Sequence, residues 1–336
     1  MMRSPGFPPH RNNFRKMKTL IKPERLCFGD TVGIIAPSSP PPDPKAVDRA
    51  AEALERFGFT PKLADNVRDR HGFLAGGDRE RAANIMQMFT DKSVKAIICL
   101  RGGYGSARLL GLLDYRLIRR HAKIFSGFSD ITSLHCAFSK KVNMISIHAP
   151  MLNGGLQSKD LKEFTRASFF NTVMEAKPPG SIVSDYDKKN ISTVRCGVAE
   201  GRLIGGNLSV LCAAIGTPFE PSFKGKILFI EDVNEQPYRL DRMLTHLLNA
   251  GVLRQVAGVA VGVNRDCEDD GKDEVVDEYR QTSADVMAER LQPLGVPVVV
   301  GLPFGHVAFN ATVPVGAHAR LDGDNGDLII TEAAVS

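Results

Sequence analysis

Short apolar runs alternate with amphipathic segments through the first half of the chain. The runs Thr31–Ala36 and Val94–Leu100 have the length and composition of buried strands. Between them, Pro44–Phe57 and Arg79–Phe89 place apolar residues at helical spacing. Strands that alternate with helices predict a parallel sheet covered on both faces.

The same alternation continues to residue 174. Two short helices, two further strands and two longer helices are predicted there: Ala107–Leu113, Tyr115–His121, a strand beginning at Ile124, Ile131–Ser139, Met144–His148 and Leu161–Met174. In parallel sheets of this kind, ligands bind at the carboxyl ends of the strands. Three loops follow such ends, and we expect the chemistry there: Pro37–Pro40, Arg101–Gly105 and Gly127–Asp130.

The pattern changes after residue 175. Residues 176–190 are polar, contain a Pro-Pro-Gly turn and are predicted to be a linker. Strand-like segments with glycine turns then dominate: Val194–Val198, Gly201–Leu203, Gly225–Glu231, Val256–Val263, Val296–Val300, Ala311–Val315, Ala317–Leu321 and Leu328–Thr331. Three helices interrupt them: Leu208–Ile215, Tyr238–Asn249 and Ser283–Leu294. We therefore expect an N-terminal domain over 21–175 and a β-rich, curled or barrel-like C-terminal domain over 191–336.

Composition and charge exclude several classes of protein. The chain is 43% hydrophobic and 24% charged with a net charge of +5, and part of that charge lies in the first 18 residues, which contain no acid. Residues 1–20 are predicted to be a disordered basic tail, which leaves a nearly neutral body with no demand for nucleic acid or an anionic membrane. The tail is a poor signal peptide, and no apolar run has the length of a membrane span.

The cysteines indicate a reducing compartment. Six of them are far apart and form no C-x-x-C pair: Cys27, Cys99, Cys136, Cys196, Cys212 and Cys267. This spacing argues against a disulfide scaffold or a zinc site and favours the cytoplasm. The acidic stretch 264–281 lacks the spacing of a calcium loop and is predicted to be a solvated loop.

The stretch Ile124–Thr132 has the order of a strand, a tight turn and a helix. That setting holds a serine out of the fold as a nucleophile, and it makes Ser129 a candidate. The usual second glycine of the G-x-S-x-G pattern is replaced by Ile131. The alternative is that Ser129 caps the following helix, and from this window alone the cap is favoured.

Two further stretches carry residues suited to chemistry. Arg101–Gly105 (Arg-Gly-Gly-Tyr-Gly) lacks the spacing of phosphate-loop and dinucleotide signatures, but its glycines let backbone N–H groups approach an anion. A structural turn explains Gly105 alone, so an anion-binding role is favoured. Glu231 ends an apolar strand, where an unpaired carboxylate is costly. It is predicted either to orient a histidine or, with its acidic neighbours, to cap the helix near Tyr238.

Among the histidines, local context ranks His306 first as a general base, because it lies in a glycine-bracketed loop after a strand. His148 at a strand end ranks second. Taken singly, each is more often structural. His135, on the helix after Ser129, is predicted to be a packing or solvent residue.

Six blocks, in order from about Arg25 to the C-terminus, together resemble the L,D-carboxypeptidases (muramoyl-tetrapeptide carboxypeptidases) and the related microcin-immunity serine peptidases. The blocks are Gly29–Val32 with Ala36–Ser38, Arg101–Gly105 with Arg108–Leu110, Gly127–Thr132, Gly205–Leu208 with Gly216–Pro218, Glu231–Glu235 with Arg239–Leu244, and Gly301–His306. One departure is His148-Ala149-Pro150-Met151, where the family often has Gly-Pro-Met. The extra methyl group puts the substrate range in question more than the mechanism.

The resemblance implies a Ser-His-Glu triad of Ser129 as nucleophile, His306 as base and Glu231 as acid. It also implies an α/β fold with a Rossmann-like parallel-sheet N-terminal domain, a β-rich, barrel-like C-terminal domain and a homodimer. Because the nucleophile and the base come from different domains, the triad is expected to assemble across the cleft between them.

The implied reaction releases terminal D-Ala from cytoplasmic murein tetrapeptide, in peptidoglycan recycling, through an acyl-enzyme. We expect the backbone N–H groups of Asp130 and Gly103 to form the oxyanion hole. The carboxylate of Asp130 is expected to cap the helix that follows Ser129, which we call the elbow helix. The free carboxylate of the departing D-residue needs a cationic or N–H-rich pocket, and Arg101 or the loop amides, including Gly102 and Tyr104, are the candidates for binding this part of the substrate. The reaction calls for no metal and no organic cofactor.

Three other readings remain open from sequence. An immunity-type peptidase that cleaves a peptidyl-nucleotide antibiotic would need an aromatic pocket, and the chain has no Trp and only five Tyr. A non-catalytic nucleotide- or phosphate-binding module would use the glycine loops alone. A general α/β-hydrolase esterase shares the order Ser, acid, His, but Ile131 and the β-rich second domain argue against it.

Overall fold

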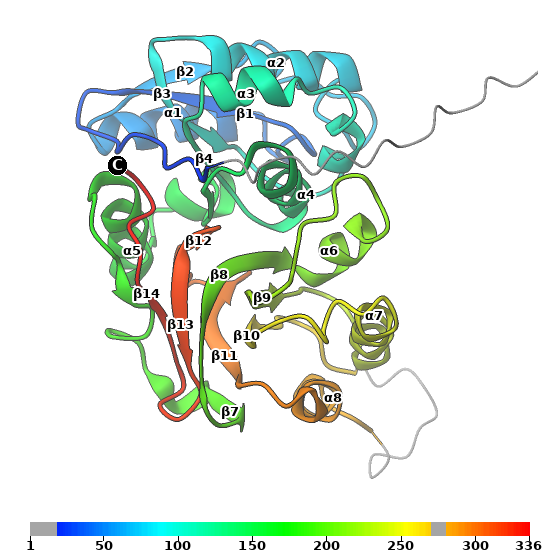
Figure 1. The fold of residues 1–336 in the computed structure, drawn as a ribbon. Helices are drawn as coiled ribbons and strands as arrows, with labels where there is room; N and C mark the ends of the chain where they lie inside the picture. The colour runs from blue at the N-terminus through cyan, green and yellow to red at the C-terminus, as the bar shows by residue number, and fades with distance from the viewer. Residues whose placement is uncertain (1–18, 270–279) are drawn as a thin grey trace, which may run out of the picture.

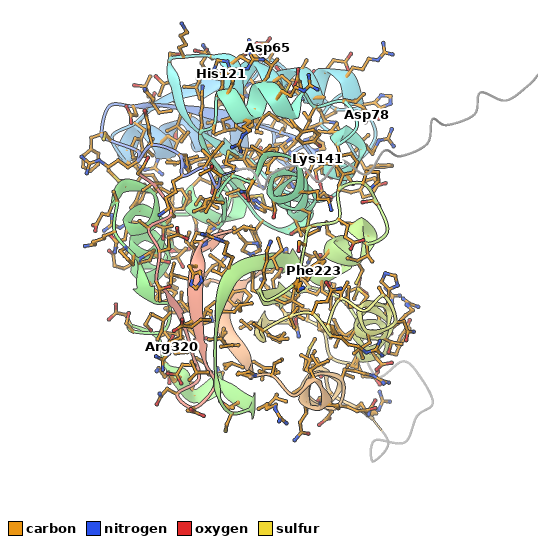
Figure 2. The ribbon with its side chains drawn as sticks, in the orientation of Figure 1. Asp65, Asp78, His121, Lys141, Phe223 and Arg320 are labelled. Carbon is orange, nitrogen blue, oxygen red and sulfur yellow. The ribbon has the colours of Figure 1, made fainter. Side chains whose placement is uncertain are left out.

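In the computed structural model, which describes residues 19–269 and 280–336, the chain forms a six-stranded and an eight-stranded sheet (Figure 1). The predicted basic tail, except for its last two residues, and part of the acidic loop lie outside the described residues. Side chains fill the space between the sheets and their helices, and Phe223 near α6 is only 2% exposed (Figure 2). No described helix combines the length and apolar character needed to span a membrane.

The first sheet is parallel apart from one edge strand and has the order β12-β5-β4-β3-β1-β2. Its strands are β1 (Thr31–Ile35), β2 (Thr60–Leu63), β3 (Val94–Cys99), β4 (Ile124–Gly127), β5 (Ser146–His148) and β12 (Val313–Val315). Its helices are α1 (Ala46–Arg56), α2 (Asp78–Thr90), α3 (Tyr115–Arg120), α4 (Thr132–Ala137) and α5 (Glu163–Met174).

Both faces of this sheet are covered, as the sequence pattern predicts. Successive side chains of a strand point to opposite faces. Accordingly, Ala96 and Ile98 of β3 belong to one apolar cluster, together with residues of α1 and α5. Ile97 and Cys99 belong to a second cluster, which includes residues of α2, α3 and α4. The continuous apolar run of β3 is therefore explained by burial on both sides.

The second sheet is mixed and has the order β6-β14-β13-β8-β9-β10-β11-β7. Its strands are β6 (Gly180–Ser181), β7 (Ser192–Arg195), β8 (Val198–Asn207), β9 (Ile227–Glu231), β10 (Gly258–Val263), β11 (Val298–Gly305), β13 (His318–Asp322) and β14 (Asp327–Ile330). Its helices are α6 (Leu208–Ala214), α7 (Pro237–Asn249) and α8 (Ser283–Leu291). Edge strand β7 lies close to the turn between β13 and β14, since Thr193 Oγ1 donates a hydrogen bond to the carbonyl of Gly323 there.

Three segments differ from the sequence-based expectation. Residues 176–190, predicted as a linker, contain β6, which pairs with β14 and extends the second sheet. Residues 311–315, predicted within the C-terminal domain, contribute β12 to the first sheet, where Val313 pairs with His148. The predicted helix Ala107–Leu113 is a short 3-10 turn, Ser106–Leu109. Pairing with distant strands decides the first two cases, and local sequence does not carry that information.

A buried hydrogen bond next to the elbow helix joins the two halves of the chain, by which we mean residues 21–175 and 191–336. The Oγ1 atom of Thr132, the first residue of α4, accepts a hydrogen bond of 2.9 Å from the backbone N–H of Asn207 at the end of β8. The contact is so close that a Cβ added to Gly206 would lie 2.4 Å from Thr132 Oγ1. Gly206 also has a φ of +137°, which favours glycine. The side chain of Asn207 accepts a hydrogen bond from Val210 and caps α6.

Replacement of Thr132 tests this connection. Thr132→Val keeps the shape but leaves the buried N–H of Asn207 without an acceptor, so we expect the free energy of unfolding to fall by about 1–3 kcal/mol. Thr132→Ser is the matched control, because it keeps the hydroxyl and loses one methyl group, at a cost of about 1 kcal/mol. Urea denaturation measures both. A valine variant as stable as the wild type would contradict the role of this bond.

Candidate active site

Ser129 lies in a strained turn between β4 and α4. Its φ is +62°, a left-handed conformation that costs a residue with a side chain about 1–3 kcal/mol. A Cβ at Gly127 would lie 3.0 Å from Ile131 and 3.2 Å from Cys99, so the turn needs a glycine there. The short 3-10 turn Ser129–Ile131 has no side-chain cap. The alternative that Ser129 caps the helix is therefore wrong, and its hydroxyl is left at the surface of a pocket.

His306 directly follows β11 and is held by the triad acid predicted from sequence. Its Nδ1 lies 2.7 Å from Oε2 of Glu231, which is fully buried at the end of β9. A Cβ at Gly305 would approach Glu231 Oε2 to 2.9 Å, so a glycine before His306 lets the two side chains meet. With Nδ1 bound to an acid, the other ring nitrogen is the one available for proton transfer.

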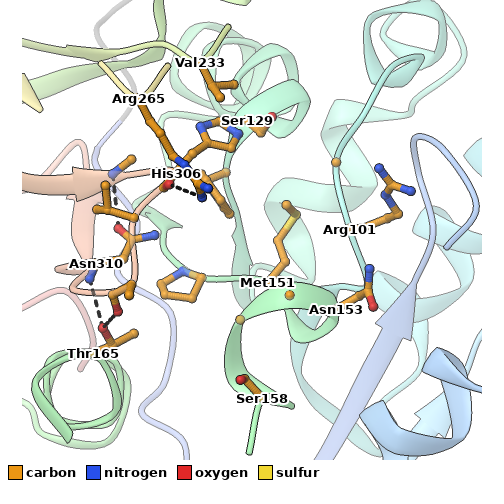
Figure 3. A pocket seen from close by; sticks show the side chains of 18 of the residues that line it. Arg101, Ser129, Met151, Asn153, Ser158, Thr165, Val233, Arg265, His306 and Asn310 are labelled. Atoms are coloured by element: carbon orange, nitrogen blue, oxygen red, sulfur yellow. Dashed lines mark hydrogen bonds between the residues drawn. The ribbon is translucent and has the colours of Figure 1, made fainter. Parts of the chain in front are cut away.

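Ser129 and His306 line the same pocket and appear next to each other in Figure 3. The ring of His306 packs on Phe128, the residue before Ser129, with 4.7 Å between ring centroids. Across the described residues, no hydrogen bond joins Ser129 Oγ to His306. Catalytic hydrogen bonds are often long before substrate binds, so this geometry suits an unliganded site.

Asn207 and Asp232 surround the buried Glu231, but sequence reasoning gave neither a role beside it and considered Asp232 only as a possible helix cap. The amide nitrogen of Asn207 lies 3.3 Å from Glu231 Oε1 and 2.9 Å from Asp232 Oδ1. Burial raises the pKa of Asp232 to about 6, although hydrogen bonds from Val233 and Asn207 oppose this rise. The helix α7 starts without a side-chain cap, so the alternative that one of these acids caps the helix near Tyr238 is wrong.

The carboxylate of Asp130 connects the turn at Ser129 to the loop Pro37–Pro40 and to the first residue after the glycine loop. It accepts hydrogen bonds from Ser38 Oγ at 2.5 Å and from the backbone N–H of Ser106 at 2.8 Å. The expectation that this carboxylate caps the elbow helix is therefore wrong, because both its partners lie in other loops. Among the described residues, no backbone carbonyl accepts a hydrogen bond from the N–H of Asp130, which leaves this N–H available to an oxyanion.

The glycine loop after β3 lies against Ser129. A Cβ on Gly102 would lie 3.1 Å from Ser129 Cβ and 3.4 Å from the backbone nitrogen of Asp130. Gly103 also lines the pocket, and its φ of +105° favours glycine. The fully buried Arg81 holds the loop in place, since its Nη1 donates hydrogen bonds to the carbonyls of Pro37 and Gly105.

The two other predicted binding residues of this loop lie in different surroundings. Arg101 is half-buried in the pocket, where Nη1 donates to Pro40 O at 3.0 Å. Burial lowers its pKa, and none of the described ion pairs gives it an acidic partner. Tyr104 is 54% exposed, packs on Phe73 and does not line the pocket. The structure therefore brings Arg101, but not Tyr104, to Ser129.

The pocket has a volume of about 730 Å³ and is lined by residues of both halves of the chain. Its charged lining residues, besides His306, are Arg101, Asp160, Lys162 and Arg265, so cations outnumber acids. Several lining residues had no signal in the sequence because they lie in loops without a motif: Met151, Asn153, Thr165, Arg265 and Asn310. Within the described ranges, no group of three or more His, Cys, Asp or Glu side chains is arranged to hold a metal ion.

The other two histidines near the elbow are core residues. His148, ranked second as a base, is fully buried among Phe128, Phe229 and Phe304, and burial lowers its pKa well below the usual value. It does not line the pocket, so the hypothesis of a base at His148 is wrong.

His135 was predicted to be either a packing or a solvent residue, and the structure shows that it is a packing residue. It contacts Ser146 Oγ and the carbonyl of Gly127, and burial lowers its pKa to about 4.

Two family models match the chain in the same order as its domains. Residues 32–149 match the LD-carboxypeptidase N-terminal domain, and residues 200–321 match the LD-carboxypeptidase C-terminal domain. The first range contains Ser129, and the second contains Glu231 and His306.

Whole-chain comparisons agree with these matches. A probable murein peptide carboxypeptidase of Bacillus subtilis is 39% identical over 94% of this chain and 95% of its own length. The crystal structure of a muramoyltetrapeptide carboxypeptidase from Oxalobacter formigenes has a TM-score of 0.76 and 32% identity, covering 90% of this chain and 99% of that one. The microcin C7 self immunity protein MccF has a TM-score of 0.83 and 26% identity, covering 94% and 99%. By its matched domains and these relatives, the chain belongs to the LD-carboxypeptidase family of serine peptidases and is a peptide hydrolase.

Proposed function

We propose that this enzyme is a serine carboxypeptidase that cleaves the L,D-peptide bond of murein tetrapeptide and releases the terminal D-Ala. The observation that carries the proposal is a strained Ser129 that shares a pocket with His306, which is in turn hydrogen-bonded to the buried Glu231. Relatives named as murein peptide and muramoyltetrapeptide carboxypeptidases support the choice of substrate. The homodimer and the cytoplasmic location implied by the resemblance stay predictions.

In the first half of the reaction, Oγ of Ser129 attacks the carbonyl carbon of the L-residue. His306 takes the hydroxyl proton and transfers it to the nitrogen of the departing D-Ala as the C–N bond breaks. Glu231 fixes the tautomer of the imidazole and stabilises its protonated form. The product of this half is an acyl-enzyme and a free amino acid.

In the second half, a water molecule attacks the acyl carbon, and His306 takes its proton and returns it to Ser129. The negative oxygen that forms in each half lies against the backbone N–H of Asp130 and, we propose, that of Gly103. The surroundings of Gly102 support this role, because a Cβ there would lie 3.3 Å from Ser129 Oγ and 3.4 Å from the Asp130 nitrogen. The residue after the nucleophile donates to the oxyanion in other enzymes with such a turn.

The lining of the pocket favours a peptide over a nucleotide. Apart from His306, Phe128 is the one aromatic residue among the described lining residues. Nucleobases bind best where aromatic faces are available for stacking. An immunity-type peptidase that cleaves a peptidyl nucleotide remains the second candidate, supported by the similarity to MccF over nearly the whole chain.

Mass spectrometry of the two substrates tests the proposal. We expect the wild-type enzyme to release D-Ala from L-Ala-γ-D-Glu-meso-diaminopimelate-D-Ala. We expect it to leave aspartyl sulfamoyl adenosine intact, a compound bound in one MccF structure. We expect Ser129→Ala to lower turnover by about 10⁴-fold or more. Ser93→Ala, in an exposed turn, is the control variant.

Each contrary result has a defined meaning. Full turnover by Ser129→Ala would remove the serine mechanism. Cleavage of the nucleotide substrate alone would favour the immunity-type peptidase. A wild-type protein that cleaves neither substrate would favour a binding module.

Gly102→Ala tests the oxyanion site and keeps all three proposed triad side chains, but its new methyl group would also lie 3.3 Å from Ser129 Oγ. The new methyl group would lie 3.4 Å from the Asp130 nitrogen, in the space that an oxyanion needs. Gly102 has no positive φ, so alanine causes little backbone strain. We expect kcat/KM to fall by about a hundredfold or more, because the loss of one oxyanion donor has this effect.

Gly111→Ala is the matched control, since Gly111 also lacks a positive φ and its Cβ would meet open space. Thermal denaturation of both variants, beside the kinetics, separates a blocked site from a damaged fold. A Gly102→Ala enzyme of normal activity would mean that the oxyanion lies elsewhere.

A further inference from the structure

Two arginines enter the pocket from different halves of the chain. Arg101 follows β3 of the first sheet, and Arg265 follows β10 of the second. They lie on opposite sides of Ser129 in Figure 3, with His306 on the side of Arg265. A guanidinium group recognises carboxylates well, because its N–H groups match the two oxygens. A substrate with carboxylates on both sides of the scissile bond would suit this arrangement.

Arg265 is held beside the loop that carries the general base. Its backbone N–H donates to Asp232 O at 3.1 Å, and its backbone carbonyl accepts from Asn234 at 3.0 Å. Its Nη1 donates to the carbonyl of His306 at 3.2 Å, and its Nε lies 3.2 Å from Asp266 Oδ2. In the hydrogen bonds of the described residues, Nη2 has no acceptor. One edge of the guanidinium is thus fixed, and the other has a donor free for a ligand.

The direction of proton transfer determines which part of the substrate lies near Arg265. His306 must give its proton to the leaving nitrogen, so the departing D-residue lies on the His306 side of Ser129. The carboxylate of that residue is bonded to the same Cα as the nitrogen, which puts its oxygens about 3–4 Å from the nitrogen by bond lengths alone. The group that binds this carboxylate must therefore be a neighbour of His306.

Building on the proposed function, we infer that Arg265 binds the terminal carboxylate of the departing D-residue and so restricts the enzyme to the chain end. Arg101, the candidate from sequence, then faces the acyl side, where a side-chain carboxylate of the third residue pairs with it. The half-buried Arg101 has no acidic partner among the described ion pairs, and a substrate carboxylate supplies one.

Two substrate pairs distinguish the two arginines. The first pair is the tetrapeptide and its C-terminal amide, which differ in the terminal charge. The second pair carries meso-diaminopimelate or L-lysine at the third position, which differ in the side-chain carboxylate. The variants are Arg265→Gln, Arg265→Lys and Arg101→Gln, with Arg49→Gln on the exposed surface of α1 as the control.

The wild-type enzyme is expected to prefer the free acid to the amide by about tenfold or more, as a charge-assisted hydrogen bond predicts. Arg265→Gln is expected to lower kcat/KM for the acid by about the same factor. The acid-to-amide ratio then approaches one, and Arg265→Lys restores part of it. Arg101→Gln keeps the acid-to-amide ratio and loses the preference for diaminopimelate over lysine.

Several results would overturn the inference. An equal loss on acid and amide in Arg265→Gln would mean that Arg265 only supports the His306 loop. A collapse of the acid-to-amide ratio in Arg101→Gln would assign the terminal carboxylate to Arg101. A wild-type enzyme without preference for the acid would also refute it, although Ser129-dependent release of D-Ala would leave the proposed function intact. No cleavage of any of these peptides by wild type would refute both.

Discussion

The candidate site depends on a run of buried hydrogen bonds that crosses from one sheet to the other. Thr132 Oγ1 binds the backbone of Asn207, the side chain of Asn207 binds Glu231, and Glu231 binds His306. The elbow helix, the strand-end acid and the base loop therefore have a fixed spacing. Because buried polar groups are costly without partners, a shift at one end would leave a donor or acceptor unsatisfied at the other.

The same run explains how two adjacent carboxylates are tolerated in the interior. Glu231 and Asp232 are both almost completely buried, where a carboxylate without hydrogen-bond partners is costly. Asp232 accepts hydrogen bonds from Asn207, Ser209 and Val233. These partners oppose the rise of its pKa, which nevertheless reaches about 6. The side-chain amide of Asn207 contacts both carboxylates, so it holds Glu231 and Asp232 in place relative to each other.

Sequence reasoning predicted the parts of the fold that are set locally. The apolar run of β3 and the spacing of α1 and α2 needed no distant partner to be read correctly. The strand-end positions of Ser129 and Glu231 followed from the same patterns. The ranking of His306 above His148 also agrees with the structure, in which His148 is fully buried. The choice of Ser129 as nucleophile over cap needed the resemblance, since its own window favoured the cap.

The rest depends on contacts between residues far apart in the chain. Asn207 reaches Glu231 across 24 positions, and Arg265 reaches His306 across 41. Neither residue has neighbours whose pattern would indicate such a contact. The pairing of β12 with β5 is also invisible locally, because an apolar three-residue strand fits the edge of either sheet. The tertiary arrangement decides these cases.

The edge strand β12 has a consequence for how substrate enters. It pairs with β5 of the first sheet, while β11 and β13 on either side of it in the chain belong to the second. Opening the cleft by a rigid hinge would pull β12 away from β5 and break the ladder between Val313 and His148. The pairing of β12 with β5 thus joins the two halves close to Ser129. The proposed peptide substrate would therefore enter the pocket without a rigid opening of the two halves, and the hydrogen bond between Ser129 and His306 would form on binding.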